Sequence, residues 1–223
     1  MIDYVLRKGY MQPEVCDKWI DFFDKFEKSD LITKFNNSRK ILDYNHKEFL
    51  EKRKFTSLKF PLAREGSEHL RNSFNQCIDL TNKVNAEHWN FKIKNYRAAI
   101  NRYSEGDLYT AHTDVAGLLA RRSYNRSKSR PVDNNITAVV LLSDSKLCKG
   151  GKFQLLSCCY KVETEFDNFT KGDILIFPAY KAHAVTKITE GFRHSLTIWA
   201  KGPPLHKQVS GKKWLDRHGF RWV

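Results

Sequence analysis

Two histidines and one aspartate have the types and spacing that metal chemistry requires. His112 and Asp114 stand two positions apart in a segment that alternates like a β-strand, so both side chains are expected on the same face. His183 follows the apolar stretch 173–177 and begins another predicted strand. Two imidazoles and one carboxylate occupy one side of an octahedral ion and leave three positions open, as in non-haem Fe(II) sites. The three residues are therefore predicted to bind one Fe(II), with Mn(II) or Zn(II) able to replace it.

Arg193 is the predicted partner of a carboxylate near that ion. Glu190-Gly191 has the composition of a hairpin turn, and pairing across it would set His183 opposite Thr197. Arg193 would then share a face with His183, roughly 13 Å along the strand at about 3.3 Å per residue. A guanidinium at that place suits the far carboxylate of a five-carbon dicarboxylate that chelates the metal. The alternative is a surface arginine on an edge strand.

Taken in order, these features resemble a known family, the 2-oxoglutarate- and Fe(II)-dependent dioxygenases, and most of all its prolyl 4-hydroxylase-like branch with viral and bacterial members. The resemblance covers about residues 96–201. It is carried by Tyr103-x2-Gly106-x2-Tyr109-x2-His112-x-Asp114, then Ile136-Thr137, Leu142-Ser143-Asp144 and Gly150-Gly151, then His183 and Arg193 ten residues later.

The resemblance implies a double-stranded β-helix, or jelly-roll, with the metal triad at its mouth. It implies Fe(II), 2-oxoglutarate and O2 as cofactor and co-substrates, with ascorbate as an optional addition. In that family pattern Tyr103 and Arg193 hold 2-oxoglutarate, Thr197 is a weaker candidate for the same role, and Tyr109 lies beside the substrate.

The implied reaction is hydroxylation of a C–H bond, at a prolyl residue of a protein or peptide, with release of succinate and CO2. Two alternatives stay open. The first keeps the chemistry and acts on a nucleic-acid base or another acidic substrate. The second is a non-catalytic basic β-domain that binds nucleic acid, in which the triad is a coincidence; release of succinate in the presence of iron separates it from both enzymes.

The charge balance indicates an acidic partner. The chain has 39 lysines and arginines against 25 acidic residues, a net charge of +14, which favours an acidic peptide or nucleic acid as partner. Residues 116–135 form a long polar stretch that is predicted to be either a functional loop or a disordered one. Its residues Arg121 and Arg122 are candidate contacts to an acidic substrate, and the tail 202–223 is also basic.

Cysteine usage and hydropathy limit the class of protein. Five scattered cysteines without a CxxC pair argue against a disulfide framework and against a cysteine-bound zinc. No apolar run approaches 18 residues, and the first ten residues lack the apolar core of a signal peptide. The sequence therefore predicts a soluble, cytoplasmic protein without membrane contact.

The elements that must position these residues follow from periodicity. A helix is predicted to begin at Pro13 and a second one to cover about 65–86, each with an apolar stripe at helical spacing. Residues 29–62 show no clean period and are predicted to be irregular, with one short helix. After Trp89 the period changes to two, and seven short strands are predicted: 91–103, 108–114, 136–143, 152–156, 172–177, 182–187 and 192–200.

This order predicts a mainly β fold with N-terminal helices (α+β), that is, a jelly-roll core supported by two or three helices. One domain is expected for residues 1–223. Residues 1–88 would be the helical support, 89–201 the catalytic core and 202–223 a basic tail.

Overall fold

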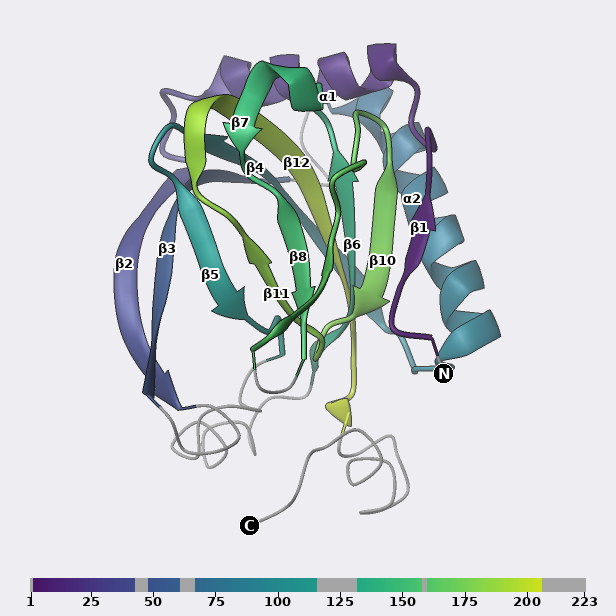
Figure 1. Cartoon of the computed structure of the whole chain (residues 1–223). Helices are drawn as coiled ribbons and strands as arrows, with labels where there is room; N and C mark the ends of the chain where they lie inside the picture. Colours follow the sequence, from purple (N-terminus) through teal and green to yellow (C-terminus); the bar gives the residue numbers. More distant parts are fainter. Residues whose placement is uncertain (1, 43–47, 61–66, 116–131, 158–159, 206–223) are drawn as a thin grey trace.

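The computed structural model describes residues 2–42, 48–60, 67–115, 132–157 and 160–205. Within them it contains two α-helices, one short 3-10 helix and twelve β-strands (Figure 1). The helices are α1 (Pro13–Phe26) and α2 (Glu68–His88), and the 3-10 helix is Ser145–Leu147. The strands are β1 (Val5–Arg7), β2 (Ile32–Leu42), β3 (Glu48–Lys59), β4 (Asn95–Ser104), β5 (Leu108–His112), β6 (Asp133–Leu141), β7 (Cys148–Gly150), β8 (Phe153–Leu156), β9 (Val162–Glu165), β10 (Ile174–Pro178), β11 (Ala182–Val185) and β12 (Ile188–Gly202).

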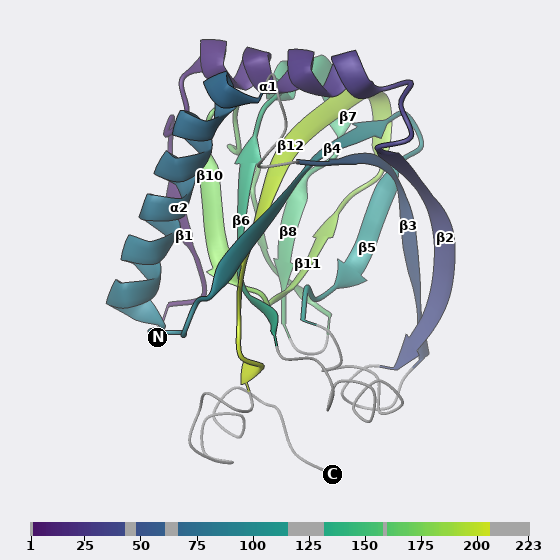
Figure 2. The same cartoon turned by 180° about the vertical axis from the view of Figure 1, so that it is seen from behind.

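The strands form one antiparallel sheet that curls onto itself. Its hydrogen-bonded order is β1-β10-β6-β12-β4-β3-β5-β11-β8-β9, with β2 added to β3 and β7 added to β12. In both views β8 and β11 lie across from β6 and β12, so the curled sheet has two facing layers (Figures 1 and 2). The predicted fold class, mainly β with a jelly-roll core and N-terminal helices, is confirmed.

Period-two alternation separates two cores. On β6, Ile136, Ala138 and Val140 join the cluster that contains the helices, whereas Val139 and Leu141 join the cluster between the layers. Strand β12 follows the same rule, with Leu196 and Ile198 on the helix side. Successive side chains of a strand leave opposite faces. Odd-numbered residues of β4, β6 and β12 therefore face the space between the two layers, and this is where chemistry can be placed.

The two helices cover the outer face of β4, β6, β10 and β12 (Figure 2). Helix α1 begins with Pro13, whose missing N–H costs nothing in the first turn. Its Trp19 and Phe23 are fully buried, and the Trp19 indole donates a 3.1 Å hydrogen bond to Ser73 Oγ of α2. None of the helices in the described part of the chain is long and apolar enough to cross a membrane.

The prediction for residues 29–62 is wrong. Instead of irregular chain, the structure has the long hairpin of β2 and β3, paired in register from Ile32↔Leu58 to Leu42↔Glu48. One face of this hairpin is open, with Lys34 and Asn36 exposed, while the Phe35 and Phe55 rings pack together on the inner face with their centres 4.8 Å apart. A hairpin with one face exposed to solvent needs few apolar residues, so the alternation of apolar and polar residues along it is weak in the sequence.

The predicted hairpin between His183 and Thr197 is also wrong. Strand β11 pairs with β5 and β8, and β12 pairs with β4, β6 and β7. Gly191 lies inside β12 with a φ of +77°, where a Cβ would stand 2.0 Å from the Leu147 carbonyl oxygen. The glycine thus serves a close backbone approach of β7 instead of a chain reversal.

Candidate functional site

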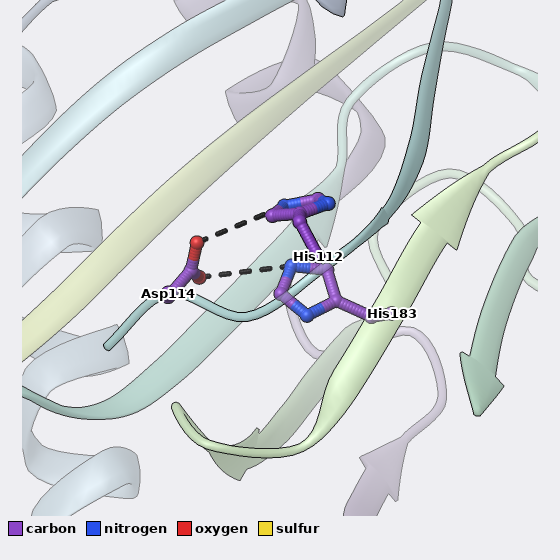
Figure 3. A group of neighbouring side chains, drawn as sticks. All are labelled: His112, Asp114 and His183. Carbon is purple, nitrogen blue, oxygen red and sulfur yellow. Dashed lines mark ion pairs between the residues drawn. The ribbon is translucent and has the colours of Figure 1, made fainter. Parts of the chain in front are cut away.

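His112, Asp114 and His183 meet at one point between the layers (Figure 3). In the β5–β11 pair His112 lies directly opposite His183, and Asp114 follows two residues after the end of β5. Their ligand atoms all lie within 4.8 Å of one another. The Nε2 atom of His112 is 3.8 Å from Asp114 Oδ1, and that of His183 is 3.7 Å from Asp114 Oδ2. Strand pairing therefore assembles the three groups that the sequence spacing singled out.

Backbone carbonyls fix the tautomer of both histidines. Nδ1 of His112 is 2.8 Å from the Thr110 carbonyl oxygen, and Nδ1 of His183 is 3.0 Å from that of Lys181. A carbonyl oxygen only accepts, so each Nδ1 carries a proton, and in the neutral tautomer that binds a metal each Nε2 then presents a lone pair. This second contact is typical of histidines that bind metals.

Asp114 is positioned by two donors from the opposite layer. Its Oδ2 accepts a 2.6 Å hydrogen bond from Thr137 Oγ1 and a 3.0 Å hydrogen bond from Trp199 Nε1. Sequence reasoning assigned neither residue to the site. The available signal was parity, because Trp199 shares the odd, inward-facing positions of β12 with Arg193 and Thr197.

The donor set fits a divalent ion of the Fe(II) class. Two imidazole nitrogens and one carboxylate are all borderline or hard ligands, and they converge from one side. The histidine rings are buried, with Phe177 edge-on to His183 at 4.9 Å and Phe153 stacked on it at 5.6 Å. The rings that pack against His183 hold it in place and exclude water from one flank of the group.

Arg193 lies opposite Tyr103 in the β4–β12 pair and is only 3% exposed. Its Nη1 donates a 3.2 Å hydrogen bond to Ser195 Oγ, while its buried Nη2 has no partner among the described residues. Burial lowers the pKa of the guanidinium, and nearby Tyr103 opposes that shift. A buried cation with an unused donor indicates a site for an anionic group.

Tyr103 lies under that guanidinium. The Arg193 Cζ atom is 5.8 Å from the centre of the Tyr103 ring, which is itself stacked on Phe55 at 4.9 Å. Burial strongly raises the pKa of the Tyr103 phenol, so its oxygen keeps its proton and can donate to an anion. Thr197, the weaker candidate, lines the same cavity and accepts a 3.0 Å hydrogen bond from Asn101 Nδ2.

Tyr109 is stacked on His112, with ring centres 3.4 Å apart and planes 5° apart. They are three positions apart, which in a regular strand would place them on opposite faces. The β5–β11 register shifts between His183↔His112 and Val185↔Tyr109, and this irregularity brings both rings to the inner side. Burial raises the pKa of Tyr109, which keeps the phenol neutral.

A cavity of about 250 Å³ connects these groups. It contains the metal triad, Arg193, Tyr103, Tyr109 and Thr197, so the structure brings together every predicted site residue that it describes. Arg121 and Arg122 lie outside the described residues. His194, with even parity, faces away from the cavity and packs against Phe23 of α1.

Comparison with known proteins agrees with this geometry. Residues 98–201 match the model of the 2OG-Fe(II) oxygenase superfamily. A PKHD-type hydroxylase from Cupriavidus pinatubonensis is 32% identical over 104 residues, which are 47% of this chain and 42% of that protein. The match thus spans less than half the length of this relative.

Solved structures share the fold over nearly the whole chain. A Pseudomonas putida prolyl-4-hydroxylase aligns with a TM-score of 0.65 at 12% identity, covering 90% of this chain and 92% of that one. A Trichoplax adhaerens prolyl hydroxylase, in complex with a peptide of the hypoxia inducible factor oxygen degradation domain, aligns with a TM-score of 0.66 at 13% identity. That alignment covers 94% of this chain and 88% of the other.

Proposed function

We propose that this chain is a member of the 2OG-Fe(II) oxygenase superfamily, whose model residues 98–201 match, and that it is an Fe(II)- and 2-oxoglutarate-dependent dioxygenase that hydroxylates a prolyl residue in a protein or peptide. One observation carries the proposal. A His-Asp-His triad with both histidines buried, and a buried arginine whose Nη2 has no partner among the described residues, line one cavity of about 250 Å³. The first group suits Fe(II) and the second suits the far carboxylate of 2-oxoglutarate.

The protein's part in the reaction is binding and orientation. His112, Asp114 and His183 would hold the ion through two Nε2 atoms and one carboxylate oxygen. When bound, Fe(II) with 2-oxoglutarate and O2 supplies the oxidation that turns a C–H bond into C–OH, with succinate and CO2 released. Thr137 and Trp199 keep Asp114 aimed at the ion, because both donate to its Oδ2.

Arg193 and Tyr103 would bind the co-substrate at the other end. Their backbones are directly opposite in adjacent strands, and the arginine has its Nη2 available for a carboxylate. The neutral Tyr103 hydroxyl would add a second donor to the same anion. Holding both ends of 2-oxoglutarate fixes its orientation before the substrate arrives.

The substrate would enter beside Tyr109, whose ring covers one face of His112. A prolyl target is supported by the likeness to the two prolyl hydroxylase structures, one of them in complex with a peptide. The net charge of +14 supports the alternative of a nucleic-acid substrate, and the test therefore includes oligonucleotides.

The test is incubation of the protein with Fe(II), 2-oxoglutarate and O2 in the presence of proline-containing peptides. Succinate release coupled to a mass gain of one oxygen on the peptide is expected. Alanine-for-proline peptides and a panel of oligonucleotides are the matched substrates, and His183→Ala is the matched inactive variant. Oxygen gain on oligonucleotides alone would move the substrate to nucleic acid, and wild-type protein without any succinate release would contradict the dioxygenase itself.

A further inference from the structure

The cavity has a second set of cations that the proposed chemistry does not use. Apart from Arg193, its lining includes Arg53 and Lys59 of β3 and Arg97 of β4. Asp114 is the one carboxylate among the lining residues that the structure describes, and the proposed metal would neutralise it. Three unused positive charges around one small cavity need an explanation.

Lys59 and Arg97 are neighbours on the same inner face. Lys59 lies directly opposite Ala99 in the β3–β4 pair, and Arg97 is two residues from Ala99, so the two cations are diagonal neighbours across the strands. Both are exposed, and neither has an acidic partner among the described residues. Like charges at neighbouring positions repel one another, and a bound anion between them would relieve that repulsion.

The Trp199 ring lies between Arg97 and the proposed metal ligand Asp114. Its Cζ atom is 5.9 Å from the centre of the Trp199 ring, and the same indole donates to Asp114 Oδ2 at 3.0 Å. An anion bound to Arg97 would therefore lie close to Asp114, the carboxylate that would bind the proposed ion. Adjacent Cα atoms of a peptide are about 3.8 Å apart, so a side chain of the residue next to the oxidised one could span that separation.

Arg53 repeats this arrangement on other strands. Its Cζ atom is 5.7 Å from the centre of the Tyr109 ring, and Tyr109 is stacked on His112. It is partly neutralised, because its Nε lies 3.7 Å from Glu51 Oε1. Arg97 and Lys59 are therefore the stronger anion site, and Arg53 is an additional charge on the β5 side.

We propose that the substrate is an acidic peptide, in which a carboxylate side chain next to the hydroxylated residue binds Arg97 and Lys59. This rests on the proposed dioxygenase function and adds the substrate class. A guanidinium and an ammonium on neighbouring strands can both bind a single carboxylate. The peptide is favoured over single-stranded nucleic acid because the guanidiniums of Arg97 and Arg53 cover the aromatic faces on which bases would stack.

The experiment measures binding, independently of turnover. Fluorescent peptides with a central proline flanked by glutamates, or by the isosteric glutamines, are titrated with the Mn(II)- and 2-oxoglutarate-loaded protein at low salt. About a 10-fold preference for the glutamate peptide is expected, and Arg97→Gln or Lys59→Gln should each reduce it by about 3- to 5-fold. Arg71→Gln, on the exposed face of α2, is the matched control and should keep the preference.

Charge reversal makes the test directional. Arg97→Glu should lose the preference for glutamate and gain one for a lysine-flanked peptide, and added salt should weaken both effects. Equal binding of the glutamate and glutamine peptides by the wild-type protein would overturn the inference, as would an oligonucleotide that displaces the glutamate peptide at lower concentration than the unlabelled peptide itself.

The two proposals fail in different ways. Uncoupled succinate release without peptide depends on the triad and Arg193, and it should be similar in the wild type and the Arg71→Gln control. Succinate release without charge discrimination would leave the dioxygenase standing and remove the acidic peptide. Selective binding of the acidic peptide without succinate release would do the reverse.

Discussion

Arg193 is the residue on which co-substrate affinity should depend most. Replacing it by alanine removes a charge-assisted contact to a buried carboxylate, worth about 1.5–3 kcal/mol, so 2-oxoglutarate should bind roughly 10- to 150-fold more weakly. Tyr103→Phe removes one hydroxyl and should cost less. Calorimetric titration of 2-oxoglutarate into the Mn(II)-loaded protein measures both effects.

Arg193→Lys is the control for charge, since it keeps the cation but loses the planar fork of donors. Its affinity should lie between those of the wild type and the alanine variant. An alanine variant with wild-type affinity would place the dicarboxylate elsewhere in the cavity.

Trp199 should affect metal affinity through Asp114, without contacting the proposed ion itself. Its indole donates one of the two hydrogen bonds at Asp114 Oδ2. Trp199→Phe keeps an aromatic ring and removes this donor, so the affinity for Mn(II) should fall by roughly 10-fold or more. Competition with a chelating dye measures that affinity directly.

Trp89→Phe is the matched control, because the Trp89 indole also donates a hydrogen bond, to the Ile2 carbonyl oxygen, away from the cavity. It should leave Mn(II) binding unchanged. If both variants bound the ion like the wild type, the role of Trp199 would be limited to packing.

At the scale of elements, the contact between α1 and β12 should make the free energy of unfolding fall at acid pH. His194 of β12 is 2% exposed, packs edge-on against Phe23 and Phe192, and has no hydrogen-bond partner on either ring nitrogen among the described residues. Burial, with Arg102 and Arg193 nearby, lowers its pKa from 6.5 to about 4. The folded protein therefore keeps this imidazole neutral where the unfolded chain would protonate it.

Protonation of His194 in the unfolded chain makes the protein less stable at acid pH. Between pH 6.5 and 4 the unfolded chain binds more protons at His194, so the free energy of unfolding falls as the pH drops, by up to about 1.4 kcal/mol per pH unit. Urea titrations of the metal-free protein at pH 7 and pH 5 measure this change. Between these pH values the free energy of unfolding of His194→Leu should fall by roughly 2 kcal/mol less than that of the wild type. An identical decline in both proteins would show that other groups set the acid sensitivity.

At the scale of the whole molecule, the proposed metal should stabilise the fold as well as the site. His112 and His183 come from one layer of the sheet, while Asp114 is held by Thr137 and Trp199 of the other layer. An ion that binds the folded chain alone, at 100 times its Kd, adds about 3 kcal/mol to the free energy of unfolding. For a chain of this size that raises the Tm by roughly 5–10 °C.

Thermal denaturation with Mn(II), and again after addition of a chelator, measures this effect. His183→Ala removes one ligand and should lose most of the shift, while Mg(II) at the same concentration should give less, because it prefers oxygen ligands. An equal Mn(II) shift in the wild type and the variant would locate the ion outside the triad.

The sequence by itself determined which faces the strands present. Alternation along a strand depends on the strand alone, so the inward direction of Arg193 and Thr197 held even though the hairpin assumed for them does not exist. It also singled out the three residues of the proposed metal site, by side-chain type and, for His112 and Asp114, by their spacing along one segment. The two helices and seven of the nine strands after Trp89 were predictable for the same local reason, while the short strands β7 and β9 were not predicted.

Only the tertiary structure decided which strands are neighbours. The β5–β11 pair that sets His112 opposite His183, the polar β2–β3 hairpin, and the donors from β6 and β12 to Asp114 all join segments far apart in the sequence. A period of two fixes the face of a residue but not its partner across the sheet. The partner is decided by the packing of the whole curled sheet. For that reason Thr137 and Trp199 could be assigned to the site only from the three-dimensional structure.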